Sequence, residues 1–154
     1  MSNLPYTAPS VILPNESGKI IDLKSFRPNP IVLFFYPRDN TSSCTREAKD
    51  FTENLEIFDG AKVSVFGISK DSIESHDKFI KKQNLTISLL SDENGTVCED
   101  FGVWKEKSMY GKIYMGIERS TFIIDGKGLV IKEWRKVKVP GHVNEVLQVI
   151  ETLI

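Results

Sequence analysis

Long apolar runs and an excess of positive charge are both missing from this sequence. The longest uninterrupted apolar run is six residues, from Ile31 to Tyr36, whereas a membrane-spanning helix needs about 20. The 20 Lys and Arg residues are balanced by 21 Asp and Glu residues, so the formal net charge is -1. Surfaces that bind nucleic acid usually carry a strong basic excess. We therefore expect neither a membrane protein nor a nucleic-acid-binding protein.

Cysteine is also scarce, with only Cys44 and Cys98 present. Small secreted domains are usually rich in cysteine, so this low content favours a reducing compartment. The first ten residues contain neither the basic segment nor the apolar segment of a secretory signal. We expect a cytoplasmic protein with free thiols.

Proline is concentrated near the N-terminus, which predicts an extended, turn-rich start followed by regular structure. Residues 10–13 and 19–23 alternate in hydropathy around a turn-forming cluster and predict a β-hairpin. Residues 31–36, bounded by Pro30 and Pro37, are typical of a strand buried on both faces of a sheet. Further strands are expected at residues 62–69, 86–90, 121–124 and 129–134, with the last two joined by an Asp-Gly-Lys-Gly turn.

Helices are expected between these strands. One begins near Cys44, has an apolar face formed by Cys44, Ala48, Phe51, Leu55 and Phe58, and closes at Gly60. Others are expected at residues 72–84, 97–103 and 142–154. The alternation of strands and helices predicts an α/β, thioredoxin-like fold in which helices flank a central mixed sheet, with a β-hairpin at the N-terminus. We expect a single domain spanning residues 1–154.

Cys44 is the residue with the clearest chemical potential, since it lies in the first turn of a helix that follows a strand. Unpaired backbone N–H groups and the positive end of the helix dipole favour the thiolate there. The hydroxyls of Thr41, Ser42 and Ser43 can donate hydrogen bonds beside the sulfur, although each is also a common N-cap. A buried structural cysteine is the alternative.

The segment from Pro37 to Cys44 resembles the P-x-x-x-T-x-x-C signature of the peroxiredoxins. The chain as a whole is similar to the peroxiredoxin Q (bacterioferritin comigratory protein) subfamily. The positions that fit this pattern are Leu13-Pro14 with Gly18-Lys19, residues 32–37, 67–69, 89–93 and 101–104, Gly111-Lys112, and residues 119–122.

This resemblance implies a thiol-dependent peroxidase in which Cys44 attacks a peroxide oxygen and becomes a sulfenic acid. Arg119 would stabilise the thiolate and the departing oxygen, Thr41 would bond to sulfur and peroxide, and Pro37 would shield the loop. Glu47 would support Arg119. From the residues alone, without the motif, a solvated strand-end arginine is the favoured interpretation of Arg119, and Glu47 would be a surface carboxylate that complements the helix dipole.

The resemblance also indicates the partners. It implies a peroxide substrate, a thiol reductant (thioredoxin, glutaredoxin or glutathione), no cofactor, no metal, and a monomer or weak homodimer. His76 and His142 are too few and too far apart for a structural metal site, so we expect both imidazoles at the surface.

Two departures from the subfamily pattern affect the second half of the reaction. Ser42-Ser43 replaces the usual Pro-Gly, and Lys49 occupies the position where many members have a resolving cysteine. An external thiol or Cys98 must therefore reduce the sulfenic acid, and we expect the external thiol. We expect all the central strands to run parallel, so the helix bearing Cys98 should begin at the same sheet edge as Cys44. A disulfide would still need Cα atoms within about 7 Å, and a buried structural role for Cys98 is the alternative.

Two other functions stay open at this point. A thiol-disulfide oxidoreductase would need a Cys-x-x-Cys motif, but Glu47 stands where the second cysteine belongs. A non-catalytic or holdase role on a decayed peroxidase scaffold is conceivable because both the Pro-Gly pair and the usual resolving cysteine are missing.

Overall fold

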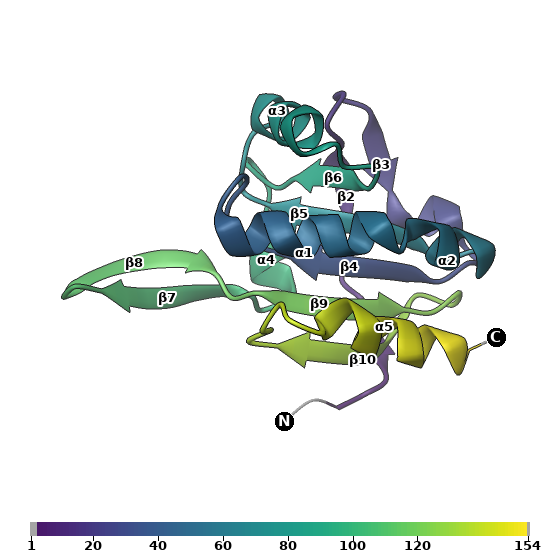
Figure 1. The fold of residues 1–154 in the computed structure, drawn as a ribbon. Coiled ribbons are helices and arrows are strands. Elements are labelled where there is room, and N and C mark those ends of the chain that lie inside the picture. Colours follow the sequence, from purple (N-terminus) through teal and green to yellow (C-terminus); the bar gives the residue numbers. More distant parts are fainter. Residues whose placement is uncertain (1–2, 154) are drawn as a thin grey trace.

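A mixed six-stranded sheet forms the centre of the protein, as a computed structural model describing residues 3–153 shows (Figure 1). The strand order is β1-β10-β9-β4-β5-β6. These strands are β1 (Tyr6–Thr7), β4 (Ile31–Phe35), β5 (Ser64–Ser69), β6 (Ser88–Ser91), β9 (Ser120–Ile124) and β10 (Leu129–Arg135). Strands β4, β5 and β6 run parallel, whereas β9 is antiparallel to β4. The mixed sheet is confirmed, and the expectation that all central strands run parallel is wrong for β9, which pairs antiparallel with β4 on one side and with β10 on the other.

Strand β4 divides the interior into two cores. All five of its residues are buried, and side chains alternate between the two faces of a strand. Val32 and Phe34 therefore join one core, whereas Leu33 and Phe35 join the other. The two cores lie on opposite faces of the sheet, and Cys44 and Cys98 belong to different cores.

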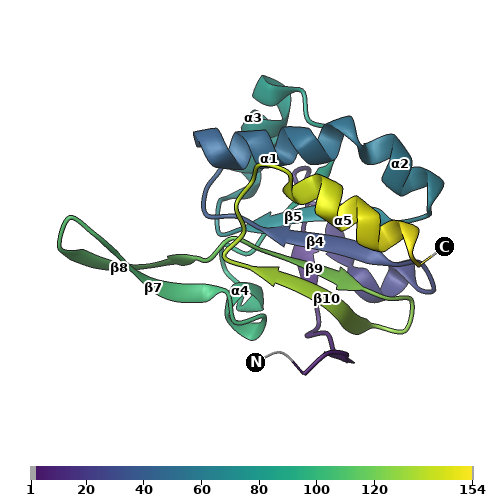
Figure 2. The same ribbon diagram turned by 60° about the horizontal axis from the view of Figure 1, so that its bottom comes forward.

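The helices divide unequally between these faces (Figures 1 and 2). They are η1 (Leu23–Phe26), α1 (Ser42–Glu53), α2 (Leu55–Gly60), α3 (Ile73–Gln83), α4 (Val97–Asp100) and α5 (His142–Glu151). Helices α1, α2, α3 and α5 contribute residues to the core of Val32 and Phe34, whereas η1 and α4 contribute to the other core. Within residues 3–153, none of the helices has the length and apolar character needed to cross a bilayer.

The helix that follows β4 is interrupted, contrary to the prediction of one continuous helix. Asn54 separates α1 from α2, and its side-chain amide donates a hydrogen bond to the carbonyl of Asp50 at 2.7 Å. Such local bonds compete with helix continuation. The predicted apolar face is nevertheless confirmed, since Cys44, Ala48 and Phe51 are buried in one core.

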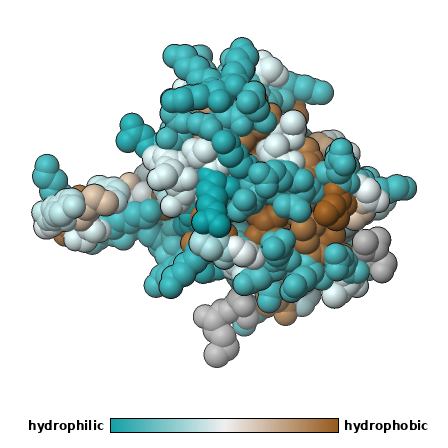
Figure 3. All heavy atoms as spheres, in the orientation of Figure 1, coloured by the Kyte–Doolittle hydropathy of each residue, from teal (hydrophilic) through white to brown (hydrophobic). Residues whose placement is uncertain are grey.

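Two hairpins and a C-terminal helix complete the fold. The predicted N-terminal hairpin is present as β2 (Ile12–Pro14) and β3 (Ile20–Asp22), which pair antiparallel. The predicted final helix is α5, although Ile154 lies outside the described residues. The arm formed by β7 (Trp104–Met109) and β8 (Lys112–Ile117) was not predicted and projects from the body (Figures 1 and 3).

Candidate active site

Cys44 lies in the first turn of α1, beyond the end of β4. Its side chain points into the core that contains Val32 and Phe34, and only 2% of the residue is exposed. The sequence therefore placed Cys44 correctly at a strand-to-helix junction. Its burial restricts access to the sulfur to small reactants unless the first turn of α1 moves.

Arg119 reaches Cys44 from a distant part of the sequence. In the pairing of β9 with β4, Ser120 lies opposite Phe35, so Arg119 lies at the same end of the sheet as the start of α1. Its Nη2 donates a hydrogen bond to Cys44 Sγ at 3.3 Å, and its Nη1 donates to Glu47 Oε1 at 2.7 Å. Arg119 is thus a bridging residue and not a solvated strand-end arginine.

Glu47 lies one turn after Cys44 on α1 and is completely buried. Burial raises the pKa of Glu47 to about 7, even though the charge of Arg119 opposes this change. Within residues 3–153, its second oxygen, Oε2, has no hydrogen-bond partner. The alternative of a surface carboxylate is therefore excluded, and Glu47 is a buried partner of the arginine.

The charge state of Arg119 depends on both neighbours. Its side chain is 13% exposed. Burial lowers the pKa of Arg119, but the negative charges of Glu47 and Cys44 outweigh this effect and raise it. The guanidinium consequently stays charged, and a cation beside sulfur favours the reactive thiolate.

The predicted hydroxyl donors lie apart from the sulfur. Thr41 is the N-cap residue of α1, and its hydroxyl donates a hydrogen bond to the carbonyl of Arg38 at 3.1 Å. The residues Thr41, Ser42 and Ser43 are all exposed, and among residues 3–153 the described side-chain hydrogen bond to Cys44 comes from Arg119. Pro37 is half-buried at the start of the same loop.

Cys98 lies on α4, in the core on the opposite face of the sheet from Cys44. It is completely buried, and its backbone N–H donates a hydrogen bond to Asp92 Oδ2 at 2.8 Å. Burial, together with the charge of Asp92, raises the pKa of the Cys98 thiol well above its ordinary value. Both helices follow parallel strands, as expected, but the sheet separates the two sulfur atoms.

Both histidines are buried, so the prediction of surface imidazoles is wrong. His142 is 3% exposed, and its Nε2 lies 2.8 Å from the hydroxyl of Thr121. Burial and the positive charge of Arg119 lower the pKa of His142 to about 4. His142 therefore approaches the active site as a neutral side chain. Each histidine is isolated in the sequence, so no local pattern predicted that His142 would be buried near Arg119.

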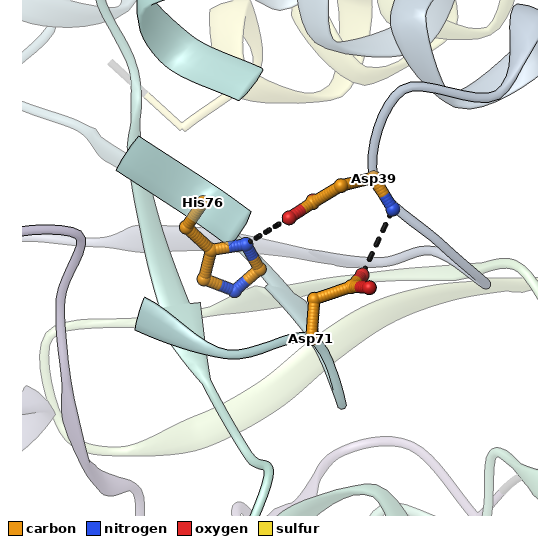
Figure 4. Close-up of side chains that lie close together, drawn as sticks. All are labelled: Asp39, Asp71 and His76. Carbon is orange, nitrogen blue, oxygen red and sulfur yellow. Dashed lines mark hydrogen bonds and ion pairs between the residues drawn. The ribbon is translucent and has the colours of Figure 1, made fainter. Parts of the chain in front are cut away.

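His76 belongs to a second polar cluster that sequence analysis missed (Figure 4). Ligand-type atoms of Asp39, Asp71 and His76 lie within 4.8 Å of one another, an arrangement that could hold a metal ion. However, Asp39 accepts hydrogen bonds from Tyr36 and His76, and Asp71 accepts one from the backbone of Asp39. The cluster is therefore a hydrogen-bonded network that fastens the loop before α1.

Lys107 is a further charged residue near the site. Burial and the charge of Arg119 lower the pKa of Lys107, while the charges of Cys44 and Glu118 oppose this change. Its stem lies along the neighbouring strand, since a Cβ placed on Gly116 would come within 3.1 Å of Lys107 Cδ. The unpredicted β7–β8 arm thus brings a second cation towards Cys44.

The chain is similar to known proteins along nearly its whole length. The model of the AhpC/TSA family matches residues 5–133. Peroxiredoxin Bcp of Bacillus subtilis is 47% identical over 146 residues, which cover 95% of this chain and 93% of the relative. Peroxiredoxin Bcp of Escherichia coli is 39% identical over 140 residues, which cover 91% of this chain and 90% of the relative.

Solved structures agree with these relatives. The bacterioferritin comigratory protein of Xanthomonas campestris superposes with a TM-score of 0.87 at 42% identity, covering 92% of this chain and 90% of that one. Peroxiredoxin Q of Xylella fastidiosa gives a TM-score of 0.89 at 35% identity, with 98% of both chains covered. The thioredoxin-like fold predicted from the sequence is thereby confirmed. The chain belongs to the AhpC/TSA family as a peroxiredoxin of the Bcp/peroxiredoxin Q type, and it is a thiol-dependent peroxidase.

Proposed function

We propose that Cys44 is the peroxidatic residue of a one-cysteine peroxidase that reduces hydrogen peroxide and organic hydroperoxides. The observation that carries this proposal is the position of Arg119, whose guanidinium donates to Cys44 Sγ at 3.3 Å and to Glu47 at 2.7 Å. We also propose that residues 1–154 belong to a single domain, whose fold brings these groups together.

In the first half of the reaction, the Cys44 thiolate attacks the terminal oxygen of the peroxide. A sulfur–oxygen bond forms, the oxygen–oxygen bond breaks, and the sulfur is oxidised to a sulfenic acid while the peroxide is reduced. The departing oxygen takes up a proton and leaves as water or an alcohol. Arg119 stabilises the negative charge that develops on this oxygen.

Thr41 and Pro37 complete the peroxide site. Since the Thr41 hydroxyl donates its proton to the carbonyl of Arg38, its lone pairs are left to accept a hydrogen bond from the peroxide. Pro37, half-buried between β4 and the loop, limits the access of water. Glu47 orients the guanidinium through the hydrogen bond that it accepts from Arg119 Nη1.

In the second half, an external thiol attacks the sulfenic acid, releases water and forms a mixed disulfide. A second thiol then attacks this disulfide and restores Cys44. Lys49 occupies the position of the usual resolving cysteine, and it is exposed on α1. Cys98 is unsuited to the task because it is buried on the other face of the sheet and its pKa is raised. A low-molecular-weight thiol or a thioredoxin-type protein fits this role.

The proposed range of peroxide substrates is based on a structurally similar protein and on the burial of the Cys44 sulfur. The structural study of the Xanthomonas campestris protein concerns alkyl peroxide reduction, so we extend that substrate class to this chain. Small peroxides suit a sulfur with 2% exposure. The low cysteine content supports a cytoplasmic site of action, and we propose a monomer or weak homodimer.

The test compares wild type with Cys44→Ser and Cys98→Ser. Each protein receives one equivalent of hydrogen peroxide or tert-butyl hydroperoxide, and sulfenic acid is trapped with dimedone and located by mass spectrometry. We expect an adduct on Cys44 in wild type and in Cys98→Ser, and none in Cys44→Ser. Sustained turnover of Cys98→Ser with glutathione or thioredoxin supports the one-cysteine cycle.

Other outcomes would contradict the proposal. A Cys44–Cys98 disulfide, or a Cys98→Ser protein that stops after one turnover, would make Cys98 the resolving residue. Wild-type protein that reacts with peroxide no faster than free cysteine would favour a holdase role instead.

A further inference from the structure

The loop that leads into α1 is fastened by a buried polar cluster, here called the Asp39 cluster, which comprises Tyr36, Asp39, Asp71, Ser75 and His76. The Asp39 side chain is its centre. Its Oδ1 accepts a hydrogen bond from the Tyr36 hydroxyl at 2.6 Å, and its Oδ2 accepts one from the Ser75 hydroxyl at 2.8 Å. His76 Nδ1 lies 2.7 Å from the same Oδ2 (Figure 4). Asp39 is therefore bound to Tyr36, which directly follows β4, and to two residues of α3.

The main chain of Asp39 is held as well. Its N–H donates to Asp71 Oδ2 at 2.8 Å, and the same oxygen accepts a hydrogen bond from the Ser69 hydroxyl at 2.6 Å. These contacts connect the loop to the end of β5. Since side chain and backbone are both fixed, Asp39 has little freedom to shift while the cluster is intact.

The hydrogen bonds of His76 show why this residue is not interchangeable with others. His76 Nε2 lies 3.0 Å from the carbonyl oxygen of Leu90 in β6, and its Nδ1 lies 2.7 Å from Asp39 Oδ2. The ring therefore contacts β6 on one side and the loop before α1 on the other. His76 is completely buried, and a buried polar contact of this kind is costly to break.

The start of α1 depends on this fastening. The N-cap residue Thr41 makes no side-chain capping hydrogen bond, although such a bond commonly stabilises the first turn of a helix. Between Asp39 and Thr41, Asn40 adopts a left-handed conformation with φ of 61°, which few non-glycine residues favour. Cys44 follows in the first helical turn. The Asp39 cluster thus holds the start of α1 in place, which the N-cap side chain does not do.

We propose that His76 and Asp39 are positioning residues for the peroxide reaction, because they hold the loop before α1 and thereby keep the Cys44 sulfur against Arg119. This inference rests on the proposed function of Cys44. Neither residue touches the sulfur or the peroxide. Loss of the cluster lets the first turn of α1 open, which separates Cys44 from Arg119 and exposes its sulfur.

Two substitutions at His76 separate the two contacts of its ring. The amide of His76→Asn takes the place of Nδ1 and can still donate to Asp39. The amide of His76→Gln takes the place of Nε2, so it reaches the carbonyl of Leu90 and abandons Asp39. The two variants are similar in polarity and burial, and they differ in whether the loop stays fastened.

The measured quantity is the ratio of two rate constants of Cys44 at pH 7, one for hydrogen peroxide and one for iodoacetamide. Peroxide reduction needs Arg119 in place, whereas alkylation needs only an accessible thiolate, so opening of the loop lowers the ratio. For His76→Gln we expect the ratio to fall about tenfold, the effect of losing one hydrogen bond to a charged group. For His76→Asn, which keeps a donor to Asp39, we expect the ratio to stay at the wild-type value.

Two controls isolate the loop from general destabilisation. Asp77→Asn removes an exposed ion pair with Lys81 on the same helix and should leave the ratio unchanged. Val97→Ala destabilises the core on the opposite face of the sheet and should also leave it unchanged. An unaltered ratio in His76→Gln, or an equal fall in both His76 variants, would overturn the proposal.

A milder variant keeps the proposal testable if His76→Gln does not fold. Ser75→Ala removes one hydrogen bond to Asp39 at a helical position where alanine is favourable. We expect the ratio to fall about threefold, and an unchanged ratio would refute the role of the cluster. If the wild-type ratio equals that of free cysteine, the proposed peroxidatic role of Cys44 is contradicted. If the wild-type ratio is high but does not change in the His76 and Ser75 variants, only the role of the Asp39 cluster is contradicted.

Discussion

Glu47 offers the most direct test of the electrostatics around Cys44. Its side chain is completely buried, and one carboxylate oxygen accepts a hydrogen bond from Arg119 at 2.7 Å. Burial raises its pKa from 4.5 to about 7 despite the opposing charge of Arg119. The folded protein therefore retains a proton on Glu47 at pH values where the unfolded chain has released it.

This difference makes stability depend on pH in a defined direction. Because the folded state binds more protons than the unfolded state, stability due to Glu47 is fully present below pH 4.5 and is lost as the pH rises through about 7. A rise in pKa from 4.5 to about 7 corresponds to about 3 kcal/mol. The amide of Glu47→Gln does not titrate, and it keeps an oxygen that can accept from Arg119.

The assay is urea unfolding at pH 5, 6, 7 and 8, followed by tryptophan fluorescence. Parent and Glu47→Gln proteins both carry Cys44→Ser, which removes oxidation and ionisation of the thiol. We expect the unfolding free energy of Glu47→Gln, relative to the parent, to increase by about 2–3 kcal/mol from pH 5 to pH 8. Groups that do not interact with Glu47 cancel in this difference. A difference that stays constant within about 0.5 kcal/mol would refute the reasoning.

Two other substitutions test separate parts of the structure. Burial and the charge of Arg119 lower the pKa of His142 from 6.5 to about 4, so its contribution to stability is lost as the pH falls below 6.5. In the same urea series, His142→Gln should therefore lose about 2 kcal/mol less unfolding free energy than wild type between pH 8 and pH 5. An equal loss in both proteins would contradict this. Gly67→Ala places a Cβ 2.7 Å from Phe34 Cζ and 2.8 Å from Leu89 Cδ2. We expect it to lower the unfolding free energy by about 1–3 kcal/mol, seen as a lower urea midpoint at unchanged slope, and an unshifted midpoint would show that β5 can accommodate the methyl group.

Local patterns predicted most of the fold because each signal came from neighbouring residues. The helix at residues 72–84 is an example, since Ser72 caps α3 and Asn84 ends it in a left-handed conformation. The β7–β8 arm was not predicted because most of its residues are exposed and only its base, at Trp104 and Ile117, packs against a core, so hydropathy does not alternate along it. Its turn uses Tyr110 and Gly111, both with positive φ, whereas Asn-Gly is the stronger signal for such a turn.

Only some of the site residues could be predicted from the sequence. Cys44 was recognisable from its place at the start of a helix, and Arg119 from its resemblance to a family motif. Burial of Glu47 was not, because a glutamate in the first turns of a helix is usually solvated. The Asp39 cluster was also not predicted, since His76 meets Asp39 only after α3 packs against β6. Tertiary packing decides these contacts, and no local spacing encodes them.

Arg119 is bordered by two ionisable side chains whose pKa values shift in opposite directions. Burial and Arg119 itself lower the pKa of His142 to about 4, and burial raises that of Glu47 to about 7. Between these values both neighbours are neutral in the folded protein, so the guanidinium charge is least offset in that range. Above pH 7 the ionised Glu47 offsets part of this charge, which weakens the stabilisation of the thiolate and of the departing oxygen. The peroxide rate of wild type should accordingly fall relative to that of Glu47→Gln as the pH passes 7. A constant ratio of the two rates would mean that Arg119 acts on Cys44 independently of its carboxylate partner.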